Sequence, residues 1–438
     1  MSLIRRISHI SANIRQFSSA LYITGDKASS NFVILLPHID FEERMENKAE
    51  LEENIKLRQK HISLDKYWKH WGFYKHLLEK MEILNATKTV INEHISELIK
   101  DAEKNKEEIE KLQLHAKQMK LHYKNLKEFS YPVEEVAALN ALSIPNILDK
   151  RTPDTEKEII YNCLEKPSEK ARSHFEIATS SNLLYYLNPT FLVLQNDAAF
   201  FEHSLINYFY DSLLNYSYVP TVNSSFARSI IVEGCCTDYL NPKEVFTVFE
   251  NDTKYSTAKL HFVGNSSLYS FMAYFAKFSI QPNYFPIKFF TSGKQYHPLE
   301  ENNTERTLFN LNQYSTVDVF SITKNNEADT EAVFQDLIKI IKTLYDSLGF
   351  HYQLAYLPAN RLRNYETLRL SIQMFSSHLQ DYVEVGNVSL CGDYLSKRLL
   401  VTYNEEKVRK YPNIIYGSVI NVQKVLGCVL EYNDLSRK

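Results

Sequence analysis

The amino-acid sequence predicts an α+β protein in which a helical arm precedes a larger mixed domain. Residues 40–130 are nearly free of glycine and proline, and they carry apolar residues at heptad spacing. After residue 180, short runs rich in aromatic and β-branched residues alternate with amphipathic helical stretches, which is typical of strands and helices that share one domain. We therefore expect an arm over residues 32–135 and a second domain over residues 136–438.

The composition is that of an ordinary globular protein. The chain is 44% hydrophobic and 24% charged, with a formal net charge of -3. A surface for nucleic acid would therefore have to be a local patch. Only 10 of the 438 residues are glycine, which leaves few places where the backbone could approach a phosphate closely. The five cysteines lack the spacing of a zinc site, and we expect neither a metal nor a cofactor.

The first 25 residues have the pattern of a mitochondrial transit peptide. Apolar residues recur at steps of three and four from Leu3 to Leu21, which would place them on one helical face. The segment holds three arginines and has no acidic residue. A basic, acid-free, amphipathic N-terminus predicts residence in the mitochondrial matrix. An ordinary N-terminal helix is the alternative.

Two heptad stretches predict that the arm is an antiparallel coiled coil. One extends from Leu77 to Leu98, the other from Ile109 to Leu126, and we expect each helix to have roughly four to five turns. The second helix is rich in lysine, and such a face is either simply solvated or attracts a phosphate backbone without reading bases. Its candidate RNA-binding residues are Lys104, Lys106, Lys111, Lys117, Lys120, Lys124 and Lys127.

The segment after the arm resembles part of the seryl-tRNA synthetases. "LSIPN", at residues 142–146, is similar to a segment that precedes the catalytic domain in that family, and Asn54, Ile55 and Arg58 are similar to its lead-in to the first arm helix. The resemblance covers nearly the whole chain after the first 25 residues. It implies a class II aminoacyl-tRNA synthetase-like antiparallel sheet flanked by helices, with a dimer interface near Pro220.

The same resemblance implies that the chain has lost the groups that would bind ATP. The family activates serine with ATP and passes it to tRNA, and the charged phosphates must be stabilised. Its Phe-Arg-x-Glu motif corresponds here to Tyr296, His297, Pro298 and Leu299. A neutral histidine cannot offer the paired donors of a guanidinium. An alignment shifted by one residue would match Glu300, but the arginine would still be missing.

Other motifs of the family are altered as well. Glu384 and Asp393 are retained, whereas no carboxylate remains where the family selects serine. We expect Val419 to occupy space where a glycine would let ATP approach, and we expect aromatic side chains to fill the old pocket. The altered positions are Gly264, Asn265 and Ser266 in the Thr-x-Glu motif, Val383 and Leu390 in a later strand, and Val419 and Lys424 in the third motif.

This pattern resembles non-catalytic seryl-tRNA synthetase paralogues of insect mitochondria. The resemblance implies that the chain does not aminoacylate tRNA and that it pairs with the mitochondrial seryl-tRNA synthetase, because a paralogue can occupy half of a two-fold interface. Pairing with itself is the alternative. Three functions stay open: a binding subunit whose arm contacts tRNA, a scaffold for other matrix proteins that binds no RNA, and a divergent active synthetase.

Overall fold

The computed structural model describes residues 19–25, 34–101, 103–188, 190–248, 258–299 and 306–436. These residues form two compact units, which we describe separately. Unit 2 comprises the described residues of 22–34 and 61–144, and unit 1 comprises the rest. Most of the expected transit peptide and the segment 300–305, which contains Glu300, lie outside the described residues.

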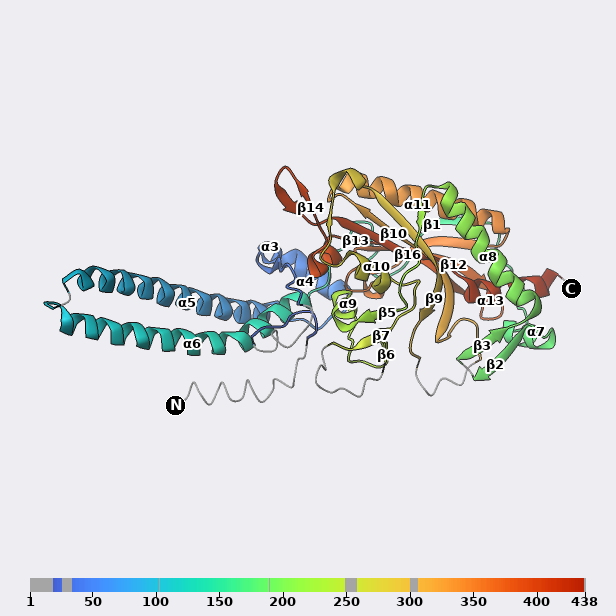
Figure 1. Ribbon diagram of the computed structural model, residues 1–438. Coiled ribbons are helices and arrows are strands. Elements are labelled where there is room, and N and C mark those ends of the chain that lie inside the picture. Colours follow the sequence, from blue (N-terminus) through green and yellow to red (C-terminus); the bar gives the residue numbers. More distant parts are fainter. Residues whose placement is uncertain are drawn as a thin grey trace. The chain divides into compact units, whose positions relative to one another are not determined.

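Unit 2 is built around two long helices (Figure 1). Helix α5 spans Leu64–Leu98, the 3-10 turn η1 spans Ile99–Asp101, and α6 spans Lys106–Leu142. With 35 and 37 residues, both helices are much longer than expected, because the regular heptads cover only part of each. The expected boundary at residue 135 falls inside α6, which continues past Pro132.

Two short helices that we expected in the arm belong to unit 1. These are α3 (Phe41–Glu46) and α4 (Lys48–Leu57). The end of the expected transit peptide also differs from the expectation. Ala20 and Leu21 fall inside the expected transit peptide, yet they are buried in unit 1. A removable segment that ended at residue 25 would therefore include buried residues.

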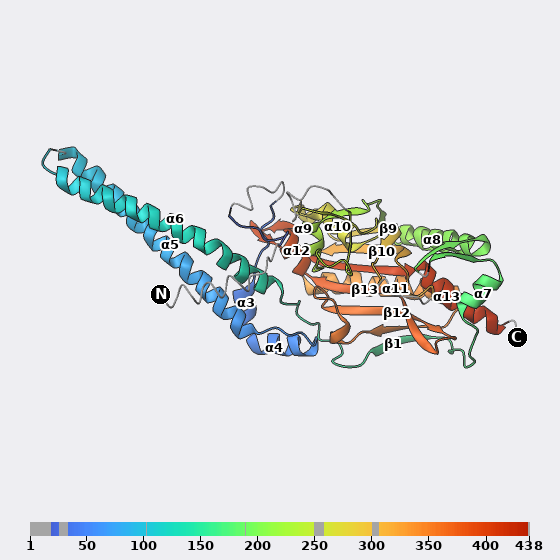
Figure 2. The ribbon, with the colours of Figure 1, turned by 90° about the horizontal axis from the view of Figure 1, so that it is seen from below.

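An eight-stranded sheet forms the centre of unit 1 (Figure 2). Neighbouring strands are antiparallel, except that β4 pairs parallel with β9. This confirms the predicted α+β class and the antiparallel sheet. In spatial order the strands are β1 (Glu158–Cys163), β11 (Tyr352–Tyr356), β12 (Leu368–Ser376), β13 (Asp381–Gly392), β16 (Asn413–Asn421), β10 (Gln313–Thr323), β9 (Ile287–Tyr296) and β4 (Val219–Pro220).

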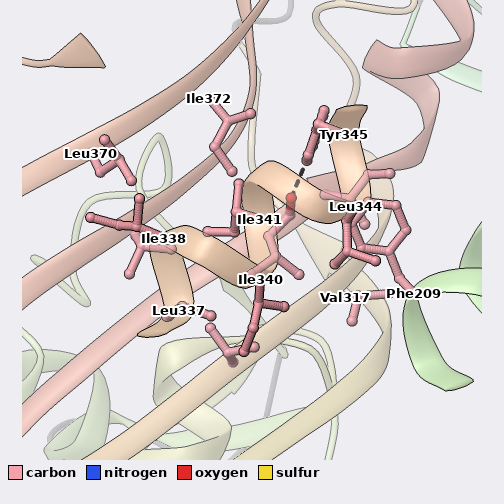
Figure 3. Close-up of a cluster of buried hydrophobic side chains, with 14 of the residues drawn as sticks. Phe209, Val317, Leu337, Ile338, Ile340, Ile341, Leu344, Tyr345, Leu370 and Ile372 are labelled. Atoms are coloured by element: carbon pink, nitrogen blue, oxygen red, sulfur yellow. Dashed lines mark hydrogen bonds between the residues drawn. The ribbon is translucent and has the colours of Figure 1, made fainter. Parts of the chain in front are cut away.

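Three helices pack on one face of this sheet: α8 (Asn196–Asn215), α11 (Glu327–Leu348) and α13 (Val422–Ser436). Figure 3 shows the core between α11 and the strands, in which Ile341 is fully buried. The hydroxyl of Tyr345 donates a hydrogen bond of 2.9 Å to the Val419 carbonyl oxygen of β16. Because apolar side chains on this face form the core, the polar side chains of the same strands lie on the opposite face.

Smaller elements surround the sheet. Helices α9 (Ser229–Gly234) and α10 (Leu268–Phe275) contact each other, and Phe271 of α10 stacks on Phe320 of β10. Within the described ranges, no helix is long and apolar enough to span a membrane. The remaining elements are α7 (His174–Ser180), β2 (Leu184–Asn188), β3 (Phe191–Leu194), β5 (Phe226–Arg228), β6 (Phe246–Thr247), β7 (Leu260–Phe262), β8 (Ser279–Ile280), η3 (Pro282–Tyr284), η4 (Ala359–Arg361), α12 (Tyr394–Leu399), β14 (Thr402–Glu405) and β15 (Val408–Lys410).

Candidate functional site

A small polar cavity lies on the sheet face opposite α8 and α11. Its volume is about 150 Å³, whereas pockets for drug-sized ligands have roughly 300–1,000 Å³. Side chains therefore do not fill this part of the molecule completely, contrary to the expectation of a filled pocket. The side chains that line the cavity include Gln295, Thr316, Arg369, Glu384, Tyr416 and Lys424.

The retained carboxylate of Glu384 already has protein partners. It accepts hydrogen bonds from the Arg369 guanidinium and from Ser371 Oγ, the latter at 2.7 Å. The same guanidinium donates to Glu366 at 3.1 Å. Burial opposes ionisation of Glu384, but the charge and hydrogen bond of Arg369 outweigh it and hold the pKa of Glu384 below its ordinary value. Glu384 is therefore an ionised member of an internal ion pair.

The loop that holds Gly264, Asn265 and Ser266 is packed against the hairpin strands. Gly264 has φ +88°, and a Cβ there would lie 2.0 Å from the Lys294 carbonyl oxygen. Asn265 Oδ1 accepts a 3.0 Å hydrogen bond from the Lys294 backbone N–H, and Ser266 Oγ accepts one of 3.0 Å from Thr316 Oγ1. Ser266 has no solvent exposure. This loop therefore serves packing, and it offers no carboxylate to a ligand.

His297, which we expect to correspond to the family's arginine, lines the cavity. Its backbone N–H donates to the Asn312 carbonyl oxygen at 2.9 Å, and Nε2 lies 3.2 Å from Gln295 Oε1. Burial, reinforced by the charges of Arg363 and Lys424, lowers the pKa of His297 to about 4. This agrees with the expectation that His297 carries no charge near neutral pH and cannot replace a guanidinium.

The other positions of this motif are also engaged in packing. The ring of Tyr296 lies against Phe262, with 4.1 Å between centroids. After Pro298, the backbone N–H of Leu299 donates a 2.9 Å hydrogen bond to Asn312 Oδ1. These hydrogen bonds therefore join the segment just after β9 to Asn312, the residue that precedes β10.

Several altered positions do not face the cavity. Leu390 and Val419 are buried in the core beneath the helices, and Val383 packs against that core. Ser418, the neighbour of Val419, lines the cavity instead, because successive side chains of a strand point to opposite faces. The expectation that Val419 would block ATP is therefore wrong. Asp393 lies at the start of α12, where it pairs with Lys397 at 3.0 Å.

Sequence reasoning missed Arg363, whose side chain lines the cavity. Its guanidinium donates to the Tyr365 hydroxyl at 3.2 Å. Lys424 Nζ, the other cation at this wall, lies 5.3 Å from the centre of the Tyr314 ring, and burial lowers the pKa of Lys424. The only available signal was the basic composition of "NRLRNYETLRL", residues 360–370. These cations can attract an anion to this wall of the cavity.

The residues that carried the resemblance meet in one buried network. Arg58, which is 2% exposed, donates to Asn54 Oδ1 at 2.9 Å and to the Asn146 carbonyl oxygen at 3.1 Å. It also donates to the carbonyl oxygens of Arg363 and Glu366, at 2.9 and 2.6 Å. Arg58 therefore holds the loop that presents Arg363 to the cavity.

The candidate RNA-binding lysines lie on or next to α6, and all seven are solvent-exposed. Two of them form ion pairs on the same helix, Lys111 with Glu107 at 2.9 Å and Lys124 with Glu128 at 3.8 Å. Exposed ion pairs of this kind contribute little to stability, so the lysines can leave their glutamate partners and contact phosphate groups instead.

Pro220 lies in the short edge strand β4 and is exposed. Next to it is an apolar groove of about 740 Å³, whose lining includes Val219, Tyr274 and Phe278. These three side chains are 52%, 67% and 50% exposed. Among the described residues, no cluster of three or more histidine, cysteine or acidic side chains could hold a metal ion.

Comparison with known proteins identifies this architecture. The model of the tRNA synthetase class II core domain (G, H, P, S and T) matches residues 261–433. The chain is 26% identical over 426 residues to the serine–tRNA synthetase-like protein Slimp of Drosophila melanogaster, covering 94% of this chain and 89% of that protein. The chain is therefore similar, over nearly its whole length, to a protein that is named as seryl-tRNA synthetase-like. It is also 20% identical to the mitochondrial serine–tRNA ligase of Mus musculus, covering 91% and 80% of the two chains.

Solved structures of seryl-tRNA synthetases have the same fold as this chain. The cytoplasmic serine–tRNA ligase of Naegleria fowleri in complex with AMP matches with a TM-score of 0.75 and 18% identity, covering 90% of this chain and 93% of the other. The seryl-tRNA synthetase of Pyrococcus horikoshii complexed with ATP matches with a TM-score of 0.78 and 14% identity, at the same coverage. The class II fold is therefore kept around a cavity whose polar groups largely bind one another.

Proposed function

We propose that the chain is a catalytically inactive seryl-tRNA synthetase paralogue that acts as a binding and regulatory subunit in the mitochondrial matrix. It pairs with the mitochondrial seryl-tRNA synthetase and contacts tRNA through the lysines of α6. The observation that carries the proposal is the loop at Gly264, Asn265 and Ser266. Its place in the serine-selecting motif comes from the family resemblance, and its close packing against β9 leaves it no group for a substrate.

Two further features of the cavity support inactivity. Glu384 is paired with Arg369, so its charge is not available to a substrate ammonium group. The position of the phosphate-binding arginine holds the neutral His297. Loss of one preorganised group that stabilises a transition state typically costs roughly 10²–10³ in rate. Several such losses at one site are consistent with no measurable turnover.

Pairing is supported by the surface around Pro220. An edge strand presents unpaired backbone groups, and an exposed apolar patch beside it favours association with another protein. The groove at Val219, Tyr274 and Phe278 supplies that patch. A partner of the same fold can complete a two-fold arrangement there.

The matrix location is supported by the basic, acid-free N-terminus and by the name of the Mus musculus relative as a mitochondrial enzyme. Contact with tRNA is supported by the exposed lysines, which can neutralise phosphates in a salt-dependent way.

Co-expression with the mitochondrial seryl-tRNA synthetase of the same organism tests this proposal. We expect native mass determination to find a 1:1 heterodimer that charges tRNA with serine. Tyr274→Arg should disrupt the heterodimer, whereas Tyr185→Arg, at a tyrosine that is 58% exposed on β2, should not. Separate homodimers would contradict the pairing and favour a scaffold that acts alone.

A further inference from the structure

An apolar groove lies along one side of the two long helices of the arm. It lies between α5 and α6, which pack side by side (Figure 1), and its volume is about 520 Å³. Its lining includes Lys80 and Ile83 of α5 and Leu126 and Phe129 of α6. The ring of Phe129 also meets the edge of Phe73 of α5, with 6.5 Å between centroids. Because all these residues belong to unit 2, the groove is a property of the arm itself.

Large apolar side chains along this side of α5 are exposed to solvent. Ile83 and Val90 are 64% and 62% exposed, and Phe73 is 48% exposed. Ile83 and Val90 are one heptad apart, so they lie on the same side of α5, next to the seam that packs against α6. From Phe73 to Val90 the rise of an α-helix gives a length of about 26 Å. An exposed apolar strip of this length beside a groove is typical of an interaction site.

The groove side of the arm has no acidic residue over this length. Residues at steps of three and four share one side of a helix. The residues of the groove side are Lys80, Ile83, Thr87 and Val90 on α5, and His115, Gln118, His122, Asn125 and Phe129 on α6. Among the described residues, the exposed ammonium group of Lys80 has no ion-pair partner. An occupant with carboxylates would therefore meet a complementary charge, whereas a second copy of the groove would bring a second Lys80.

The lysines that we propose for tRNA contact lie on a different side of α6. Lys117, Lys120, Lys124 and Lys127 also follow steps of three and four, but none of these four lines the groove. Two residues of an α-helix turn by about 200°, so Lys120 points away from His122. Nucleic acid held by these lysines would leave the groove open.

We propose that the groove binds an acidic amphipathic helix of a partner protein. The bound helix would lie against α5 and α6 as the third helix of a bundle, with apolar side chains at i, i+3, i+4 and i+7 facing Ile83 and Phe129. Its flanking carboxylates would lie beside Lys80. Association removes the exposed apolar side chains of α5 from water, which supplies the favourable free energy. This interaction is separate from the pairing proposed near Pro220.

A labelled peptide tests this proposal with the full-length chain. The probe is a stapled helix of about 20 residues, with leucine at i, i+3, i+4 and i+7 and glutamate on both flanks, and fluorescence anisotropy measures its binding. We expect saturable binding at micromolar concentrations. Ile83→Glu places a carboxylate in the groove and should weaken binding at least about tenfold. Lys80→Glu, and a version of the peptide with lysine in place of glutamate, should each weaken binding by a similar factor because the complementary charge is lost.

Leu121→Glu is the matched control. Leu121 is 58% exposed on α6 and does not line the groove, so the same change in charge at a similar exposure should leave the affinity unchanged. Because Ile83 and Leu121 are both solvent-exposed, we expect both variants to fold.

Three results would overturn the proposal: no saturable binding of the acidic peptide below about 100 μM, equal affinities of Ile83→Glu and Leu121→Glu, or equal binding of the acidic and basic peptides. Two further results would replace the occupant. Self-association of the wild type that is lost in Ile83→Glu would give the groove to a second copy of the chain. Loss of tRNA binding in Ile83→Glu but not in Leu121→Glu would give it to nucleic acid.

Discussion

The backbone N–H of Lys294 donates a 3.0 Å hydrogen bond to Asn265 Oδ1, and this contact holds the loop at residues 264–266 against β9. The adjoining Gly264 approaches the Lys294 carbonyl so closely that a side chain there would collide with it. The loop has thus become part of the packing around the sheet.

Restoring the family's motif should therefore destabilise the protein without creating a serine site. In Gly264→Thr, the left-handed φ costs about 1–2 kcal/mol and the overlap with Lys294 adds about 1–3 kcal/mol. Urea denaturation measures the loss. Gly349→Thr is the control, because Gly349 has φ +74° but no atom within 4 Å of the position that a Cβ would take, so it should lose the backbone contribution only. Equal losses would contradict the packing role of Gly264.

Arg58→Ala should lower the free energy of unfolding by about 3–5 kcal/mol. The substitution removes the Arg58 donor from Asn54 Oδ1 and from the carbonyl oxygen of Glu366, both in buried residues, and each unsatisfied group costs roughly 1–3 kcal/mol. Arg409→Ala, at an exposed position of β15, should change stability by no more than about 0.5 kcal/mol. Denaturant titration of both variants tests this, and a small effect of Arg58→Ala would show that the network does not hold the loop.

Stability should fall as the pH is lowered from about 6.5 to about 4. Burial lowers the pKa of His261 to about 4, and burial together with nearby cations does the same for His297. In this window the unfolded histidines bind more protons than the folded ones, so acid favours unfolding. For His261, which is fully buried, this difference in proton binding lowers the free energy of unfolding by at most about 3 kcal/mol.

The titration of Asp318 has the opposite effect on the pH dependence of stability. Burial raises its pKa to about 6, so between about pH 4 and 6 the folded chain binds more protons at Asp318 than the unfolded chain does, and stability falls as the pH rises through 6. Asp318→Asn keeps an acceptor for Gln295 and Tyr416 but removes the titration. Stability measured by urea denaturation from pH 4 to 7.5 should therefore depend more steeply on pH in Asp318→Asn. A shallower dependence would contradict the assignment.

Charge reversal of the arm should strongly weaken tRNA binding. With Lys117, Lys120 and Lys124 changed to glutamate, we expect affinity to fall at least about tenfold at moderate salt, and the salt dependence to become weaker, because fewer counterions are released. Filter binding or fluorescence anisotropy at several salt concentrations measures both. Lys170, Lys339 and Lys407 are exposed lysines of unit 1 that allow the same change in charge as a control. Equal effects of the two triple variants would contradict a specific role for α6.

Much of the fold could be predicted from the sequence, because its signals are local. The apolar period of α11 and the alternation in β12 are both visible in the residues themselves. The length of the two arm helices could not be predicted, because heptad spacing is regular in only part of α5 and α6. Strand β16 is also hard to predict, because Gly417 and Ser418 interrupt its run of apolar residues.

The site was harder to predict, because it depends on which face each side chain occupies. His297 lines the cavity, whereas Val419 lies on the other face of its strand. The pairing of Glu384 with Arg369 joins two neighbouring strands, and no local pattern in the sequence could indicate it.

Serine-dependent ATP–pyrophosphate exchange by this chain alone tests the central claim most directly, because that reaction requires only serine, ATP and an intact activation site. The mitochondrial seryl-tRNA synthetase of the same organism serves as the positive control. We predict exchange at the rate of a sample without enzyme. Serine-dependent exchange that disappears in Lys424→Ala would contradict the account, because it would show that the cavity still activates serine.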